Sequence, residues 1–433
     1  MSWEKGMGDE STKGEMNEGG RTEGGAAIVM TAAIVDARLA PVSVITSLDL
    51  TCAMSWFTSR RTSGESERHE GGLPASLSHH QILAGRLGHL NEQQQATFAK
   101  FKAELESAQL YSPTPTPSHD DSTLLRFLRA RKFDPAAARK QFAATEQWRK
   151  ENDVDRLFAT FDTDEMEAAK RFYPRWTGRR DKTGHPVYVF RLAALQPLQK
   201  ELNAVPPERR YQRIVALWEV MRQFATPLCN YLAQTAPNPS EPTSRDPSPS
   251  NAPPPDICAV TSIIDLADIS FSAMWSLRHH LQEASALATA HYPECMHSTI
   301  VVNSPSFFPT IWGWIKAWFD EGTRLKVHVL GRDPGPTLRE LIEEGDLPKA
   351  YGGTLDFVFE DEPVLDEAAK AVVGEGAPGP DGKPQWTLGQ VPRGPAVFKQ
   401  DGGKAWVERP AGFVMPQANG NQTAEAATNG DAK

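Results

Sequence analysis

The sequence predicts an α/β protein in which a helical N-terminal lobe is followed by a mainly parallel β-sheet with crossover helices. Three observations support this fold class. Residues 120–150 have the pattern of a basic helical hairpin, later apolar segments have the length and character of buried strands, and single helical segments separate these strands. Because parallel neighbours must be joined by a crossover, the alternation indicates strands that run mainly in one direction.

The composition limits the classes of protein to be considered. Of 433 residues, 34 are Pro, 32 are Gly and only 39% are hydrophobic, so we expect one folded unit with long segments outside its core. The four cysteines show no metal-binding spacing and no secretory signal is evident, which indicates a reducing compartment. The net charge of -9 disfavours nucleic acid as a partner of the whole protein, so an anionic partner would need a local basic patch.

The expected organisation has five parts. Residues 1–80 form a disordered leader, 81–165 a helical lobe and 166–356 the α/β domain, which carries a disordered Pro-rich insertion at 234–256; residues 357–433 form a largely disordered tail. The leader is rich in Gly, Glu, Ser and Arg, and Met30 and Met54 lie in its apolar part, so disorder and an over-extended start that leaves about 53 residues unexpressed are both open. Charged residues interrupt the apolar stretch at 26–57, which is therefore not a membrane span.

The helical lobe begins with a segment of helical periodicity at 83–110 and continues into the basic hairpin. Asp121 or Ser122 is the expected N-cap of the first hairpin helix, and Asp134 caps the second, with Pro135 at its first position. The apolar residues of the first helix share one side, which leaves Arg126, Arg129 and Lys132 clustered elsewhere. Their spacing fits a solvated face or an anion site, and does not decide between them.

Strands are expected at 186–190, 257–266, 299–303 and 325–330, and helices at 207–232, 270–290, 307–319 and 336–343. The last strand alternates, so Lys326 and His328 share one face, and Val327 and Val329 the other. This pattern fits an edge strand with one solvated face. It equally fits the floor of a cavity with a cation at its polar end.

The segment 307–319 is aromatic around nearly its whole circumference. A helix that is apolar on all sides must be buried or must meet lipid, so this segment is a core helix or a membrane-facing lid. Trp312, Trp314 and Trp318 are residues favoured at membrane interfaces, and Gly313 weakens the helix between them.

Motifs of covalent catalysis are scarce. No P-loop, GxSxG elbow or HExxH motif occurs and no GxGxxG follows a strand, so an α/β hydrolase is a weak alternative and we expect no enzyme activity. The adjacent His279 and His280 face different directions on a helix and do not predict a metal site. We therefore expect neither a metal nor a catalytic residue.

Several motifs in order resemble a known family. The run from Leu124 to Asp134, ending in Trp148-Arg149-Lys150, the Tyr292-Pro293-Glu294 motif and the closing segment 347–353 are similar to the CRAL-TRIO lipid-binding family. Within it, the chain looks most like the phosphatidylinositol transfer proteins of the secretory pathway. The resemblance spans about residues 83–356. It implies the CRAL-TRIO fold, with 307–319 as the lipid-gating helix.

The resemblance also implies a binding site. The residues that match the family's headgroup-binding positions are Arg131, Lys132, Glu294, Thr323 and Lys326. The expected gate and hydrophobic cavity comprise Phe307, Phe308, Ile311, Trp312, Trp314, Ile315, Trp318, Phe319 and Tyr188. At the positions where choline-binding members present hydroxyls, this chain has Thr177, Val260 and Ser262, and Val260 cannot bind a phosphate by hydrogen bonding.

The implied function is exchange of phosphatidylinositol between membranes through a gated hydrophobic cavity. The bound phospholipid takes the place of a cofactor, and the expected partners are phosphatidylinositol, with a second hydrophobic lipid left open, and a transiently contacted membrane surface. We expect a cytoplasmic monomer that associates peripherally with Golgi or endosomal membranes. The alternative is a regulatory lipid-sensing module that presents a phosphoinositide precursor to lipid kinases or other partners.

Overall fold

The computed structural model describes residues 83–235, 256–308, 312, 326–379 and 382–414. Within these residues, a five-stranded sheet has the order β1 (Arg175–Arg180), β2 (Pro186–Arg191), β3 (Val260–Asp265), β4 (Met296–Val302) and β5 (Val327–Val329). β1 and β2 form an antiparallel hairpin, and the later pairs are parallel. The predicted mainly parallel sheet is confirmed, although β5 is shorter than the expected strand at 325–330.

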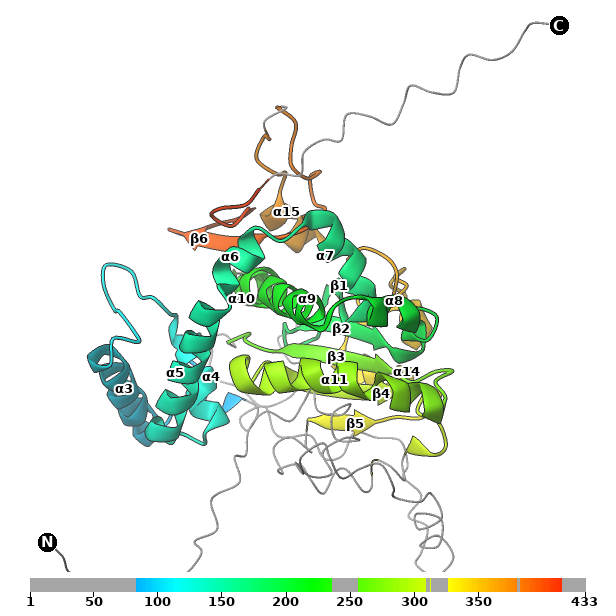
Figure 1. The fold of residues 1–433 in the computed structure, drawn as a ribbon, viewed down its shortest axis with the longest axis horizontal. Coiled ribbons are helices and arrows are strands. Elements are labelled where there is room, and N and C mark those ends of the chain that lie inside the picture. The colour runs from blue at the N-terminus through cyan, green and yellow to red at the C-terminus, as the bar shows by residue number, and fades with distance from the viewer. Residues whose placement is uncertain (1–82, 236–255, 309–311, 313–325, 380–381, 415–433) are drawn as a thin grey trace, which may run out of the picture.

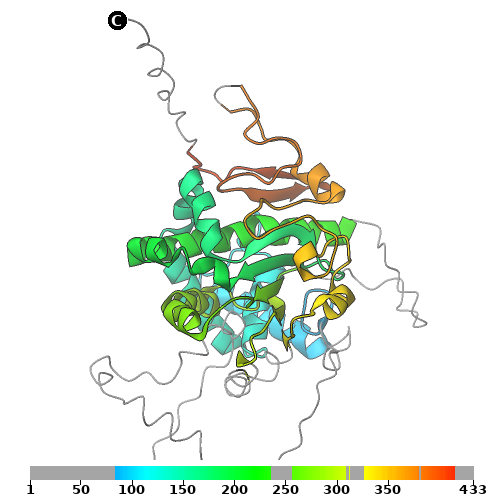
Figure 2. The same cartoon turned by 90° about the vertical axis from the view of Figure 1, so that its right-hand side faces the viewer.

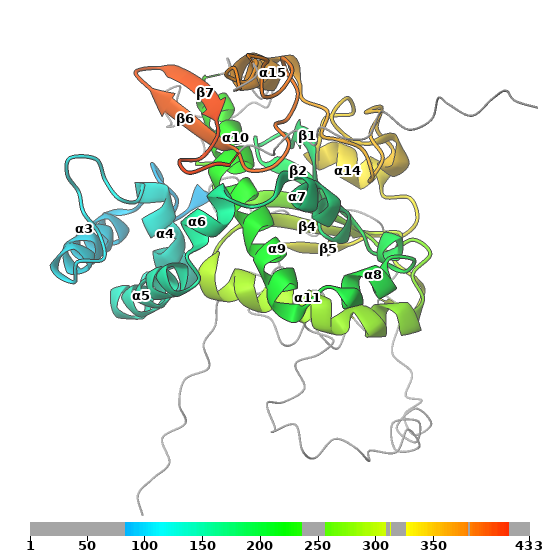
Figure 3. The same ribbon diagram turned by 45° about the horizontal axis from the view of Figure 1, so that its top comes forward.

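The order of the parallel strands determines where the helices lie. β2 to β5 follow one another in sequence order, so right-handed crossovers place the connecting helices on the same face of the sheet. The first crossover contains η3 (Leu192–Leu195), α8 (Gln199–Ala204), α9 (Pro207–Val220), a π-helical turn, η4 (Met221–Ala225), and α10 (Thr226–Thr235). The second is α11 (Phe271–His291), which Ser270 caps and which contacts α9 on that side of the sheet (Figure 3).

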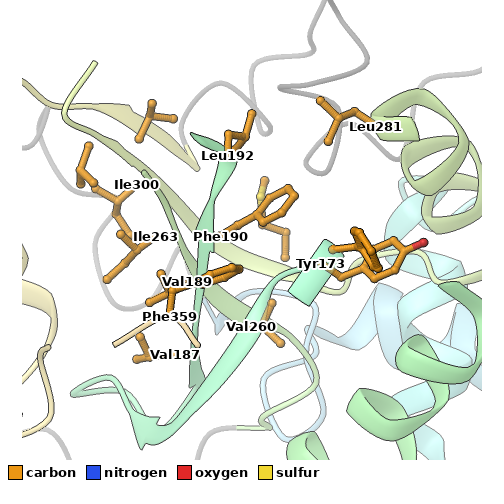
Figure 4. Close-up of a cluster of buried hydrophobic side chains, with 14 of the residues drawn as sticks. Tyr173, Val187, Val189, Phe190, Leu192, Val260, Ile263, Leu281, Ile300 and Phe359 are labelled. Carbon is orange, nitrogen blue, oxygen red and sulfur yellow. The ribbon is translucent and has the colours of Figure 1, made fainter. Parts of the chain in front are cut away.

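The two faces of the central strands differ in burial. Val187, Val189, Ile263 and Ile300 are at most 1% exposed and lie in one hydrophobic core with Phe359 (Figure 4). On the opposite face, Tyr188, Ser262 and Ile264 are only half-buried, and Tyr188 is in register with Ser262. Central strands of a covered parallel sheet are normally buried on both faces. Three residues of this face are thus incompletely covered, although Phe190, Thr299 and Val301, which the register places beside them, are buried.

The helical lobe comprises α3 (Glu92–Ser107), α4 (Asp121–Ala130) and α5 (Pro135–Glu151), at one end of the sheet (Figure 1). Asp120, rather than Asp121 or Ser122, is the N-cap of α4, and Asp134 caps α5 as expected. The long helix predicted over 83–110 begins at Glu92, because Asn91 forms a capping box with Gln94 and residues 84–88 form turns. α6 (Val154–Ala159), α7 (Thr163–Ala169) and η2 (Lys170–Phe172) lead into β1.

The C-terminal tail is folded over residues 357–379 and 382–414, in contrast to the largely disordered tail that its composition predicts. After α14 (Gly335–Leu341) and η6 (Lys349–Tyr351), it forms α15 (Glu367–Val373) and the hairpin of β6 (Val397–Asp401) with β7 (Lys404–Glu408). These elements lie against η4 and α10 (Figures 1 and 2). Trp386 and Val407 are buried with Phe224 in a second core.

Two glycines explain how a tail rich in Gly and Pro can pack so closely. Gly178 in β1 has φ +86°, and a Cβ there would lie 2.6 Å from the backbone of Val364, whose N–H bonds the Thr177 carbonyl. Gly376 lies against the Trp386 ring, where a Cβ would approach to 2.7 Å. A few large apolar residues, separated by glycines that allow close approach, are enough to hold the tail.

The predicted leader and residues 236–255 of the predicted insertion lie outside the described residues. Across the part of the chain that is described, every helix falls short of the length and apolar character needed to cross a bilayer.

Candidate functional site

A half-buried carboxylate at the end of the sheet is the centre of the candidate site. Glu294 lies in the turn between α11 and β4 with the unusual φ of +56°. Its Oε2 accepts hydrogen bonds from Arg129 Nη2 at 2.7 Å and Lys326 Nζ at 3.3 Å. Burial by itself raises the pKa of Glu294, but the charges of Arg129 and Lys326 outweigh it and lower this pKa to about 2. The site therefore holds one anion between two cations.

The turn that presents Glu294 is fixed by aromatic packing. The Tyr292 ring stacks on Trp218 with a centroid separation of 5.0 Å and contacts the edge of Trp148. Trp148 in turn stacks on His291 at 4.0 Å. Because Tyr292 precedes Glu294 by two residues, the packing of its ring limits how far the carboxylate can move.

A fully buried carboxylate, that of Glu219, anchors this turn. Glu219, at 0% exposure, accepts hydrogen bonds from Tyr292 Oη at 2.7 Å, Arg149 Nη1 at 2.8 Å and Arg222 Nη2 at 2.7 Å. Burial raises its pKa, but Arg222 and Arg149 outweigh that effect and hold the pKa well below its usual range. Glu219 thus joins α5 of the helical lobe, the π-turn and the Tyr292 turn. π-turns are frequent where helices serve functional sites.

Comparison with known proteins agrees with this architecture. Residues 173–353 match the model of the CRAL/TRIO domain, and residues 97–144 match that of the CRAL/TRIO N-terminal domain. The Sec14 cytosolic factor of Schizosaccharomyces pombe is 33% identical over 280 residues, which are 65% of this chain and 89% of that protein. The chain belongs to the CRAL/TRIO family.

Other similar CRAL/TRIO proteins come from fungi and plants. The SEC14 cytosolic factor of Eremothecium gossypii is 34% identical over 63% of this chain and 80% of its own length. The phosphatidylinositol/phosphatidylcholine transfer protein SFH9 of Arabidopsis thaliana is 29% identical over 61% of this chain and 42% of its own length. The crystal structure of Sfh5 is 17% identical, with a TM-score of 0.44, covering 64% of this chain and 95% of that one.

The structure brings together part of the headgroup set that the CRAL/TRIO resemblance implies. Glu294 and Lys326 are in contact, whereas Thr323 lies outside the described residues. Arg131 is the C-cap of α4 and donates Nη1 to the Ala130 carbonyl at 3.0 Å, and Lys132 follows with φ +51°. The arginine that binds Glu294 is Arg129, which the sequence interpretation placed in the basic cluster without giving it this role.

A helical-spacing signal could have identified Arg129. Arg126 and Arg129 are three residues apart on α4, and both point toward the start of the sheet. Arg126 Nη1 donates to Cys295 Sγ at 2.8 Å, and Arg129 Nη1 to Cys258 Sγ at 3.6 Å. Both arginines lie on the side of α4 that packs on the strands of the CRAL/TRIO domain, residues 173–353, which is called the lipid domain below. They are therefore better placed than Arg131 to reach a residue beside β4.

The described gate residues lie in or beside the core. Phe308 is 3% exposed, and Phe307, Trp312 and Tyr188 are partly buried against the same core. Phe307 also meets Phe271, which is 57% exposed, in a T-shaped contact at 6.2 Å. The remaining predicted gate residues lie outside the described residues: Ile311, Trp314, Ile315, Trp318 and Phe319.

The residues compared with choline-binding members offer few hydroxyls. Thr177 is 0% exposed and donates its hydroxyl to the Val187 carbonyl at 3.1 Å. Val260 is 8% exposed and apolar. Ser262 is half-buried on the same face of the sheet as Tyr188.

Proposed function

We propose that this chain binds one phospholipid and transfers it between membranes, with phosphatidylinositol preferred to phosphatidylcholine. The observation that carries the proposal is the contact of half-buried Glu294 with Arg129 and Lys326. A lipid phosphate can take the place of the carboxylate on these cations, and the freed carboxylate can accept hydrogen bonds from inositol hydroxyls. A choline headgroup has no hydroxyl to donate to Glu294.

A carrier has a clear physical purpose here. Two acyl chains with about 30 methylenes, at ~0.8 kcal/mol each, make escape of a phospholipid into water prohibitively slow. A protein that opens at the membrane and encloses the chains replaces this cost with a conformational step. The half-buried face around Tyr188, Ser262 and Ile264 is the surface against which the acyl chains would lie.

The proposed activity is exchange without covalent chemistry, and the bound lipid is the protein's ligand. The names of the relatives support transfer, since SFH9 and SFH7 of Arabidopsis thaliana are both named phosphatidylinositol/phosphatidylcholine transfer proteins. We further propose that the protein acts as a monomer at the surface of Golgi or endosomal membranes, with the segment 307–319 as the gate. Arg131, Lys132 and Thr323 complete the proposed headgroup site.

Lipid selectivity tests the proposal directly. Transfer of labelled phosphatidylinositol and of labelled phosphatidylcholine is measured separately from donor to acceptor vesicles. We expect faster transfer of phosphatidylinositol, and equal or faster transfer of phosphatidylcholine would contradict the assignment. A regulatory lipid sensor would instead bind phosphatidylinositol tightly and transfer it slowly, which co-purified lipid together with a low transfer rate would reveal.

A further inference from the structure

A second polar cluster lies beside the candidate site, and the proposed function does not use it. Arg86 belongs to residues 83–90, the turn segment that precedes α3, and is only 2% exposed. Its Nη1 lies 3.1 Å from His185 Nε2 and also donates to the Asp256 carbonyl at 3.1 Å. Its Nη2 lies 3.4 Å from His297 Nδ1. One guanidinium therefore links the N-terminal segment to residues just before β2 and β3 and to β4.

The two histidines together bind this guanidinium. Their rings stack in parallel, with centroids 3.6 Å apart and planes 8° apart, so the fork of Arg86 spans both ring edges. An arginine can only donate, and the nitrogens facing it must therefore present lone pairs. The remaining nitrogens, His185 Nδ1 and His297 Nε2, lie 2.8 Å and 3.5 Å from Thr183 Oγ1, which donates to Asp181 Oδ1 at 2.7 Å. This arrangement requires both rings to be neutral.

A metal ion is the obvious alternative ligand of this cluster. Asp181, His185 and His297 have ligand atoms within 4.8 Å of one another. A histidine bound to a metal carries a proton on its other ring nitrogen, however, and here Arg86 donates to that nitrogen on both rings. The lone pairs of stacked rings also lie in parallel planes and cannot converge on one ion between them. In this geometry the cluster binds a guanidinium in preference to a metal.

The charges around the cluster agree with neutral histidines. The charged and titratable groups that face Arg86, His185 or His297 from neighbouring elements are Asp181, Asp256, Cys258, Glu294, Arg129 and Lys326. Burial lowers the pKa of His185 despite the opposing effect of Asp181. Burial and the neighbouring His185 hold the pKa of His297 well below its usual value. A proton added to either ring would face the fixed charge of Arg86.

We propose that Arg86, gripped by the stacked His185 and His297, latches residues 83–90 onto the lipid domain, and that protonation of either histidine releases them. Protonation turns an acceptor into a donor that points at another donor, and places two positive charges in contact. Because both histidines are harder to protonate when the latch is closed, docking is complete above the ordinary histidine pKa of about 6.5 and is lost as the pH falls through the lower values of the closed form. The segment would thus come free beside Glu294 and Lys326 at acidic pH.

Hydrogen exchange of the full chain tests this latch. Backbone protection of residues 83–90 is compared at about pH 7.5 and about pH 5.5, corrected for intrinsic exchange, with peptides of α4 as the internal reference. We expect protection of the segment to fall at least about tenfold, the effect of one pH unit on one titrating group, while α4 stays protected. Unchanged protection, or an equal fall in α4, would overturn the proposal.

Three variants separate the latch from general acid sensitivity. His297→Gln keeps an acceptor near Arg86 without a titrating ring at that position, so the segment should stay docked and its pH response should shrink to the part that His185 carries. His279→Gln removes an exposed histidine of α11 and should behave as the parent. Arg86→Gln should expose residues 83–90 even at about pH 7.5, which keeps the test decisive if His297→Gln does not fold. Loss of protection on adding Zn²⁺ to the parent at that pH would assign the cluster to a metal and reject the latch.

Discussion

Tyr292 donates its hydroxyl to the carboxylate of Glu219 over 2.7 Å. This bond ties the turn that carries Glu294 to α9, the helix between β2 and β3. Glu219 is the penultimate residue of α9, just before the π-turn. Through Arg149, the same carboxylate also holds α5 of the helical lobe. The geometry of the candidate headgroup site therefore depends on contacts made outside the site itself.

Removing the Tyr292 hydroxyl should weaken the site more than the fold. In Tyr292→Phe, Glu219 keeps Arg149 and Arg222, so we expect a loss of about 1 kcal/mol in unfolding free energy. Phosphatidylinositol transfer should fall severalfold because the turn of Glu294 is less restrained. Tyr231→Phe is the control, since the Tyr231 hydroxyl makes an exposed 3.4 Å bond to the Gly403 carbonyl. Equal transfer rates for both variants would show that the bond does not position the site.

Lys326→Ala should reduce the rate of phosphatidylinositol transfer about tenfold or more, because a charge-assisted hydrogen bond to the phosphate contributes roughly 1.5–3 kcal/mol. Phosphatidylcholine transfer should change less, and the melting temperature should stay near that of the parent. The matched control is Lys349→Ala, an exposed lysine paired with exposed Asp356. A melting temperature that falls together with both activities would point to a structural role for Lys326.

Stability should fall on acidification through buried neutral histidines. His280 Nε2 donates a hydrogen bond to the Phe172 carbonyl at 3.2 Å, and burial lowers the pKa of His280 to about 4. Since this folded-state pKa lies below the ordinary value of about 6.5, the contribution of His280 is complete above that pH and is lost as the pH falls toward about 4. The full effect is on the order of 3 kcal/mol.

The adjacent His279 supplies the comparison for this pH effect. Denaturant unfolding of His280→Gln should lose less stability between about pH 6.5 and about pH 4.5 than the parent does, whereas exposed His279→Gln should follow the parent. Parallel curves for all three proteins would assign the acid sensitivity to other groups.

The folded tail should contribute to stability without contacting the headgroup site. Trp386 is 7% exposed and packs in the core that includes Phe224 and Val407. Trp386→Ala is therefore expected to cost about 3–5 kcal/mol in unfolding free energy. Trp406→Ala, which changes a tryptophan that is 39% exposed on β7, should cost much less. Similar melting temperatures for the two variants would contradict the packing of the tail onto η4 and α10.

The sequence predicted the parts of the fold that follow from local periodicity. The apolar strands and the single helices between them determine a parallel sheet in sequence order, and Asp134-Pro135 determines the start of α5. The tail was misjudged because its cores are made by isolated residues such as Trp386, whose partners lie far away in sequence. Composition measures the average character of a segment and does not register a few long-range contacts.

The candidate site was predicted less completely than the fold. Glu294 and Lys326 were identified through family motifs, and the structure brings them together across 3.3 Å. Arg129 received no role because side-chain direction on α4 depends on how the helix packs against the sheet. The Arg86 cluster could not be found from sequence, because Arg86 is about a hundred residues or more away from each of the two histidines along the chain.

The close approach of Gly178 to Val364 makes the attachment of the C-terminal tail sensitive to a single residue. The lipid domain and the tail meet at this point backbone to backbone, with no room for even one additional carbon atom. A single methyl group at residue 178 would act as a wedge on the tail while leaving every charged group around Glu294 chemically intact. The contact between the tail and the lipid domain can therefore be weakened without changing the residues that would bind a ligand. Attachment of the tail and recognition of a headgroup are separable properties of one chain.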